Sequence, residues 1–173
     1  MKKLISFAFL LGFLGIGNSC QSQDKSKRPS APALVKQVLA SGAEISIDYS
    51  QPLVKGRVIG KELEPKDGQV WRTGANEATV FETSKAVKVE GKDLPAGKYA
   101  LFTISGSDSW TIIFNKTWKQ WGAYDYKEAD DVLRVTVKPQ KAAVFAEKMT
   151  FDIDKSGLVT LLWGDHKVSF KVK

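Results

Sequence analysis

Cysteine and histidine are almost absent from this chain of 173 residues, which has one of each, Cys20 and His166. With a single thiol the monomer cannot form an internal disulfide, so packing must supply its stability. The lone histidine follows Gly164 and Asp165, and we interpret it as a solvated residue of a hairpin turn. Because it has no histidine or thiolate neighbours to share a metal, these shortages predict a domain without a metal centre.

Motifs for common catalytic chemistries are also lacking. There is no serine in a Gly-x-Ser-x-Gly elbow, no glycine-rich phosphate loop and no dinucleotide fingerprint. Asp152, Asp154 and Ser156 begin like a calcium-binding loop, but Trp163 stands at its twelfth position, where a carboxylate is needed. We therefore expect no cofactor, and interpret this segment as a β-turn with polar flanks.

A clustered basic run is missing too, although the formal net charge is +7. Lys2 and Lys3 lie in a predicted targeting segment, and without them the net charge falls to +5. The other lysines are scattered and lack the interleaved stacking aromatics of nucleic-acid binders. The charge therefore indicates solubility and weak attraction to anionic surfaces, with no nucleic acid as a partner.

A long apolar run occurs at residues 4–16, preceded by Lys2 and Lys3 and followed by small residues. This pattern predicts a signal peptide over residues 1–19, and about thirteen apolar residues are too few to cross a bilayer permanently. Cys20 follows directly, where bacterial lipoproteins carry an acylated cysteine. We predict lipidation of Cys20; an ordinary secreted chain with a free thiol is the alternative.

Residues 20–32 are polar, rich in serine, lysine and proline, and without periodicity. They predict a lipid-anchored flexible tether, followed by a single folded domain over residues 33–173. The predicted location is the cell envelope, where the lipid anchors the chain to the outer membrane and the domain faces the periplasm.

Alternation of apolar and polar residues dominates the predicted domain. The apolar sets are Ile45/Ile47/Tyr49, Val87/Val89, Trp110/Ile112/Phe114, Leu133/Val135/Val137, Met149/Phe151/Ile153 and Val168/Phe170/Val172. A period of two is typical of strands with one wet face, and short turn signals at 91–92, 105–108, 154–157 and 164–165 indicate antiparallel neighbours. About nine or ten strands predict an all-β, two-sheet antiparallel β-sandwich, of either jelly-roll-like or immunoglobulin-like order.

Two stretches break this alternation, residues 54–68 and 116–127, and long connections on a rigid scaffold commonly carry binding sites. The second contains Trp118, Trp121 and Tyr124, whose rings can stack on the apolar faces of sugars or other flat ligands. The alternative is that these rings plug the open end of the sandwich. We expect at least one ring to be exposed.

The densest mixture of polar and aromatic groups lies at residues 69–79. Arg72 offers a planar fork of donors, Glu77 follows across a turn, and Asn76 accepts a left-handed backbone conformation. Arg72 and Glu77 are expected either to form a partly buried ion pair or to face a ligand together. With the three aromatic residues above, Arg72, Asn76 and Glu77 are the candidate ligand-binding residues, at one end of the sandwich.

The chain also carries five long motifs in a fixed order, at residues 47–57, 70–79, 94–104, 121–124 and 131–135. In these motifs it resembles the domain of unknown function 2911 family, exported proteins of Bacteroidota. The resemblance extends from about residue 33 to the C-terminus, except at residues 64–68, where the family tends to be more apolar. It implies a location and a fold type and carries over no catalytic residue.

The residues favour a non-catalytic module of the cell envelope that binds a small ligand, a glycan or a peptide. One alternative is a hydrolase whose paired carboxylates are drawn from Asp48, Glu77, Asp125, Asp130 and Asp131. Another is a structural or assembly partner of envelope proteins that uses a sheet edge. Binding is preferred because the nucleophile, metal and cofactor signatures of catalysis are missing from the sequence.

Overall fold

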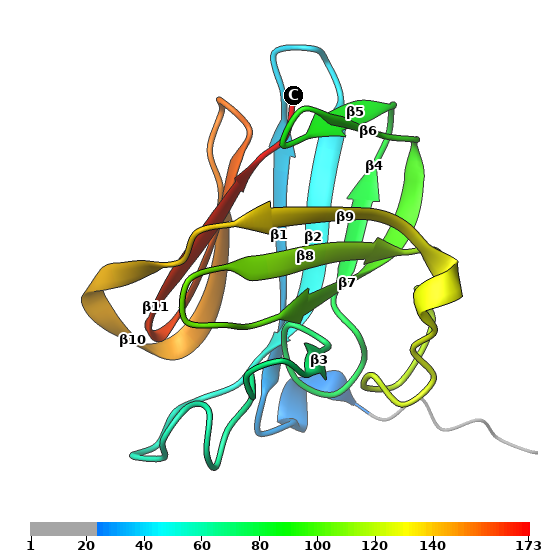
Figure 1. The fold of residues 1–173 in the computed structure, drawn as a ribbon. Coiled ribbons are helices and arrows are strands. Elements are labelled where there is room, and N and C mark those ends of the chain that lie inside the picture. The colour runs from blue at the N-terminus through cyan, green and yellow to red at the C-terminus, as the bar shows by residue number, and fades with distance from the viewer. Residues whose placement is uncertain (1–23) are drawn as a thin grey trace, which may run out of the picture.

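The structure is a computed structural model that describes residues 24–173 (Figure 1). Within this range the chain forms eleven β-strands, two 3-10 helices and no α-helix, and none of its helices is long and apolar enough to span a membrane. The elements are η1 (Lys25–Lys27), β1 (Ala31–Val38), β2 (Glu44–Gln51), β3 (Val70–Trp71), β4 (Val80–Thr83), β5 (Val87–Val89), β6 (Lys92–Leu94), β7 (Gly97–Ile104), β8 (Trp110–Asn115), η2 (Glu128–Asp130), β9 (Asp131–Val137), β10 (Gln140–Ile153) and β11 (Leu158–Lys171). The predicted signal peptide and Cys20 lie outside the described residues.

A curved antiparallel sheet makes up most of the domain. Its strand order is β1-β2-β4-β7-β8-β9, and the short β3 pairs with the end of β7. In β7 the five residues 99–103 are all buried, on both faces of the sheet. This agrees with the nearly continuous apolar run at this point of the sequence, because a strand covered on both sides needs no polar face.

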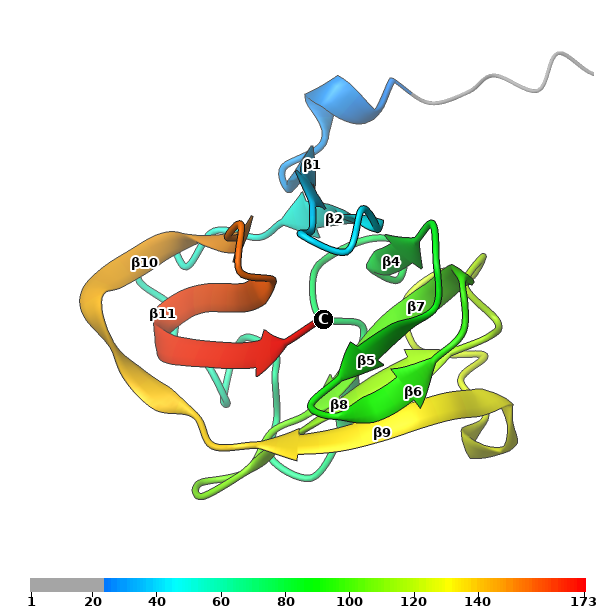
Figure 2. The same cartoon turned by 90° about the horizontal axis from the view of Figure 1, so that it is seen from above.

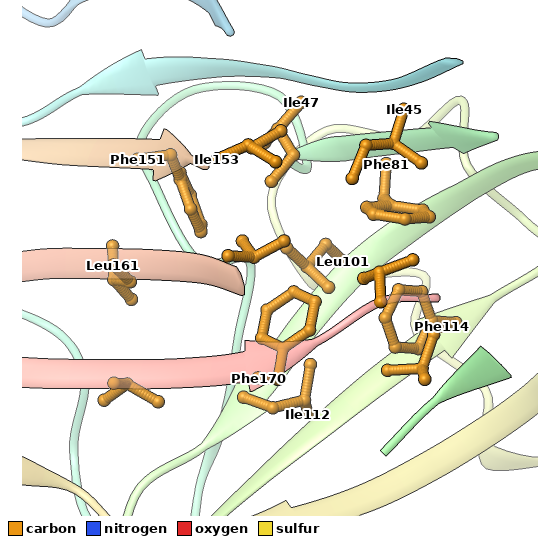
Figure 3. Packing of buried hydrophobic residues seen from close by; sticks show 14 of the residues in the cluster. Ile45, Ile47, Phe81, Leu101, Ile112, Phe114, Phe151, Ile153, Leu161 and Phe170 are labelled. Atoms are coloured by element: carbon orange, nitrogen blue, oxygen red, sulfur yellow. The ribbon is translucent and has the colours of Figure 1, made fainter. Parts of the chain in front are cut away.

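The hairpin of β10 and β11 closes the open side of the curved sheet, as the view from above shows (Figure 2). The inward side chains of sheet and hairpin meet in the main core, part of which is drawn in Figure 3. At its centre the fully buried ring of Phe114 packs edge-on against Phe81 at 5.0 Å and Phe170 at 6.0 Å between centroids. Large rings at such positions are the main source of stability in a chain that has no internal disulfide.

The predicted all-β, antiparallel, sandwich-like fold is confirmed. The predicted turns at residues 105–108 and 154–157 connect β7 to β8 and β10 to β11. In the second turn, Asp154 Oδ1 accepts hydrogen bonds from the Ser156 hydroxyl at 2.6 Å and the Leu158 backbone N–H at 3.0 Å. The segment that begins like a calcium loop is thus a β-turn with polar flanks.

One predicted turn is wrong. Gly164 and Asp165 do not separate two strands, because β11 runs through them from Leu158 to Lys171. Gly164 has a φ of 58°, in the left-handed region, and the ladder to β10 is irregular around its partner, so the glycine distorts the strand without ending it. His166 is therefore a partly buried strand residue, with its ring 5.7 Å from that of Trp110, and not a solvated turn residue.

Irregular segments gather at one end of the domain, at the bottom of Figure 1. They are the connection 52–69 before β3, the turn 72–79 after β3, and the connection 116–127 after β8. The N-terminal segment (residues 24–30), which contains η1, lies at the same end. β1 follows it at Ala31, two residues before the predicted start of the domain.

Candidate functional site

The connection 116–127 is packed onto the outer face of the large sheet. Phe102 of β7 and Ile113 of β8 are fully buried beneath it and contact Ala123 and Tyr126. The rings of Phe102 and Tyr126 meet edge-on at 5.1 Å. This second, smaller core fixes the connection on the sheet, so that its aromatic residues are held in place by packing.

A polar network anchors the two ends of the same connection. The Asp131 carboxylate, only 7% exposed, accepts hydrogen bonds from Asn115 at 2.8 Å, the Tyr126 hydroxyl at 2.7 Å and Arg134 Nε at 2.6 Å. Burial and the bond to Asp131 raise the pKa of Tyr126 to about 12, against the opposing effect of Arg134. The Tyr126 hydroxyl therefore stays protonated near neutral pH, and this satisfied network favours a single conformation of the connection.

The turn 72–79 contains two residues with left-handed backbone conformations. Asn76 has a φ of 61°, which confirms the conformation predicted for it. Thr73 has a φ of 53°, which is rare for a β-branched residue. Its hydroxyl donates to Thr103 at 3.1 Å and its carbonyl accepts from the Thr79 hydroxyl at 2.8 Å, so the surroundings hold this strained conformation.

This turn and the aromatic connection lie side by side. The Ala78 N–H donates to the Gln120 carbonyl at 3.0 Å, and the Gly122 N–H donates to the Asn76 carbonyl at 3.0 Å. The aromatic connection is therefore at the same end of the domain as the Arg72 turn, which confirms that part of the prediction.

A pocket of about 530 Å³ lies between the connection and the sheet. Its floor is the outer face of three strands and includes Pro32, Asp48, Ser50 and Val80, which share one face because they are cross-strand partners or two residues apart. Residues 118–121 form its wall, and its volume is typical of small-ligand sites.

Two indole rings line this pocket and remain in contact with water. Trp118 is 37% exposed and Trp121 is 53% exposed. Lys98 Nζ lies 5.3 Å from the Trp118 ring centroid, and the Arg28 guanidinium lies 5.8 Å from that of Trp121. The predicted exposure of at least one ring is confirmed, and neither ring belongs to the buried core.

Gln120 adds an unpaired polar atom to the same wall. The residue is 9% exposed, and its Nε2 donates to the Thr117 carbonyl at 2.5 Å. Its Oε1 is buried and has no hydrogen-bond partner. An unpaired buried acceptor costs about 1–3 kcal/mol.

Glu77 does not pair with Arg72. Its carboxylate accepts a hydrogen bond from Arg28 Nη1 at 2.7 Å and lies 3.3 Å from Lys25 Nζ. Partial burial works in the other direction, but the Arg28 hydrogen bond and the Lys25 charge outweigh it and lower the pKa of Glu77. Both cations belong to the N-terminal segment, which therefore forms one end of the pocket.

Residues 30–172 match the model of a protein family described as "Protein of unknown function (DUF2911)". The chain belongs to this family. The match includes the floor and the aromatic wall of the pocket. Comparison with curated proteins and with solved structures gave no match.

In this DUF2911 protein the remaining candidates lie outside the pocket. Tyr124 is 82% exposed, and the Asn76 side chain donates to the Ser30 carbonyl at 3.4 Å. Arg72 lines a separate pocket. The predicted residues that share the first pocket are Glu77, Trp118 and Trp121.

Sequence reasoning missed several lining groups of the DUF2911 pocket as site residues, among them Lys25, Ser50 and Gln120. Ser50 stands on the same polar face as Asp48 in the alternating pattern, which was a usable signal. Lys25 and Gln120 follow no period that could mark them. Asp48 and Glu77 supply the pocket's carboxylates, and within residues 24–173 no three His, Cys, Asp or Glu side chains gather to hold a metal ion.

Proposed function

We propose that this chain is a non-catalytic binding module of the cell envelope and that the pocket beside Trp118 and Trp121 binds a glycan. The observation that carries the proposal is the pair of partly exposed indole rings beside a floor that includes the polar side chains of Asp48 and Ser50. Sugar rings have apolar C–H faces that pack on indoles, and hydroxyl groups around their edges. An aromatic wall with a few placed polar groups is how ligand pockets combine affinity with orientation.

The polar groups of the pocket suit a ligand rich in donors. Asp48 and Ser50 stand on the floor with oxygen atoms able to accept hydrogen bonds. Each can receive a sugar hydroxyl. The lining carries two lysines, Lys25 and Lys119, and two carboxylates, Asp48 and Glu77, so its formal charges balance, which suits a neutral ligand.

A peptide ligand is less well supported. Peptides that bind sheets commonly add a strand to an open edge. The floor strands β2 and β4 are each paired on both sides, β2 with β1 and β4, and β4 with β2 and β7. An extended peptide can therefore pair only along the outer edge of the third floor strand, β1, on the side of β1 away from β2 and β4.

The carboxylates Asp48 and Glu77 line one pocket, which is the observation in favour of a hydrolase. A glycosidase needs one carboxyl with a raised pKa as its general acid. The pKa of Glu77 is instead lowered by Arg28 and Lys25, which keep it ionised. This electrostatic setting favours binding over acid catalysis.

The envelope part of the proposal is supported by the sequence. The charged start, the apolar run at residues 4–16 and Cys20 are the components of a lipoprotein signal. We infer that Cys20 is acylated and anchors the domain to a membrane of the envelope.

Tryptophan fluorescence with a panel of neutral and acidic soluble oligosaccharides tests the binding proposal. Trp118→Ala and Trp121→Ala should each weaken binding about tenfold or more, since aromatic anchors dominate such sites. Tyr124→Ala is the matched control, because it removes an exposed ring of the same connection outside the pocket, and should leave the affinity unchanged. Failure of every oligosaccharide to bind would refute the proposal, and a shortened oligosaccharide in the mass spectrum after incubation would establish the hydrolase.

A further inference from the structure

Arg72 differs from the other three arginines of the chain. Arg28 and Arg134 each contact a carboxylate, at 2.7 Å and 2.6 Å, and Arg57 donates to two backbone carbonyls. Within residues 24–173, the Arg72 side chain has no hydrogen bond or ion pair, and its Nε is buried. A partly buried guanidinium without a partner costs free energy that an anion would recover.

Arg72 lines a second pocket of about 270 Å³, which we call the Arg72 pocket. The pocket lies between the turn 72–79 and the connection 52–69, and Ser30 and Trp163 also border it. On another side the guanidinium abuts the connection 116–127, where a Cβ at Gly122 would stand 3.3 Å from Arg72 Nη1. The connection 116–127 therefore restricts the guanidinium on that side, which favours a preorganised donor.

The charges around the Arg72 pocket are unbalanced. Arg57, Lys66 and Arg72 face two carboxylates, Glu62 and Glu64, which leaves one positive charge in excess. Each carboxylate already accepts a backbone N–H: Glu62 from Val58 at 2.8 Å, and Glu64 from Lys66 at 3.0 Å. In the described part of the chain, neither forms an ion pair with these cations.

The two indoles of the Arg72 pocket have no free donors. Trp71 Nε1 donates to the Gly74 carbonyl at 3.1 Å, and Trp163 Nε1 donates to the Glu64 carbonyl at 2.8 Å. Their rings therefore contribute apolar surface only. Both indoles are almost fully buried, and Pro52, Leu63 and Ala75 also line the pocket. A cationic fork beside these apolar residues suits an anionic group on a small organic body.

We propose that the Arg72 pocket is a second ligand site, which binds the carboxylate group of its ligand to the Arg72 guanidinium. The terminal nitrogens of an arginine match the two oxygens of a carboxylate, and the single excess charge suits a monoanion better than a phosphate dianion. Arg57 and Lys66 are flanking charges. The site is separate from the glycan pocket and does not depend on it.

The carboxylate can belong to a free small acid or to the C-terminus of a peptide. In ¹⁵N-labelled protein, the NMR signals of the four arginine Nε–H groups can detect either kind of ligand. The signal that disappears in Arg72→Lys belongs to Arg72. N-acetylglycine represents the small acid, and a short peptide with a free or an amidated C-terminus represents the chain end. Saturable movement of the Arg72 signal with N-acetylglycine, and with the free but not the amidated peptide, is the expected result.

Two comparisons exclude a general salt effect. Sodium chloride at the same ionic strength and the neutral amide of N-acetylglycine should not move the Arg72 signal. Lys66→Gln, an exposed change at the rim, should weaken binding several-fold, whereas Lys155→Gln, which removes the same charge from the β10–β11 turn, should not. An Arg72 signal that no carboxylate moves, or that chloride moves equally, overturns the proposal. Lys66→Gln keeps the test decisive if Arg72→Lys does not fold.

Discussion

Glu77→Gln is expected to release the N-terminal segment from the end of the pocket beside Trp118 and Trp121. The variant removes the charge that holds Arg28 at 2.7 Å and Lys25 at 3.3 Å. The Lys25 side chain is 57% exposed and contributes little, while that of Arg28 is 17% exposed and gives most of the effect. Glu77 is itself 37% exposed, so solvent screening limits the loss to about 1–2 kcal/mol.

That loss corresponds to a roughly five- to thirtyfold larger population with the segment detached. Trypsin measures this population in a soluble form that begins at residue 21, because cleavage after Lys25 or Lys27 requires a detached segment. Arg28 is followed by Pro29 and is resistant. Cleavage should therefore accelerate by about the same factor, read from the mass of the shortened chain.

Glu82→Gln is the control, since it removes an exposed carboxylate that pairs with Lys98 at 3.4 Å on the sheet. Its cleavage rate should equal that of the wild type. Equal rates for Glu77→Gln and the wild type, with both proteins folded, would show that the segment is not held by Glu77.

The same contact predicts that docking of the N-terminal segment depends on pH. The pKa of Glu77 is lowered in the folded protein. Its contribution to the stability of the docked segment is therefore fully present above the unfolded pKa of 4.5 and is lost as the pH falls through the folded pKa. Trypsin is unsuitable at acid pH, so Trp121 fluorescence should follow the release of Arg28 from its ring. The Glu77→Gln variant should lack this acid transition, and its persistence there would assign it to another group.

Three further predictions concern packing, ionisation and location. Gly157→Ala should destabilise the fold by at least about 3 kcal/mol in thermal unfolding, because the new Cβ would stand 2.0 Å from the Val172 carbonyl oxygen. Gly91→Ala is the control, since Gly91 has a similar φ but open space around it, and should cost about 1–2 kcal/mol. Since the pKa of Tyr126 is raised from 10.0 to about 12, the wild type should lose stability between those pH values, and Tyr126→Phe should flatten that slope in alkaline unfolding curves. Cys20→Ala should move the protein from the membrane to the soluble fraction; an unchanged distribution would contradict lipidation.

Much of the fold follows from the sequence because strands are encoded locally. The alternation of Ile45, Ile47 and Tyr49 already marks the face that packs into the core, and these three residues are buried in β2. The left-handed backbone of Asn76 is likewise a property of one residue in its own turn. Gly164 shows the limit of local signals, because a glycine can either end a strand or only distort it. At Gly164 the pairing of β11 with β10 continues, so the strand is distorted and does not end.

The sequence alone marked out Trp118, Trp121 and Glu77 but not how they are combined. Arg72 and Glu77 are five residues apart, yet Glu77 pairs with Arg28, which is 49 residues away. Asp48 and Val80 meet in the pocket floor only because β2 and β4 pair in one register. Short-range spacing determines which residues share a face of a strand. Which charges meet, and which faces enclose a pocket, depends on long-range contacts, whose partners are chosen by the burial of the whole core.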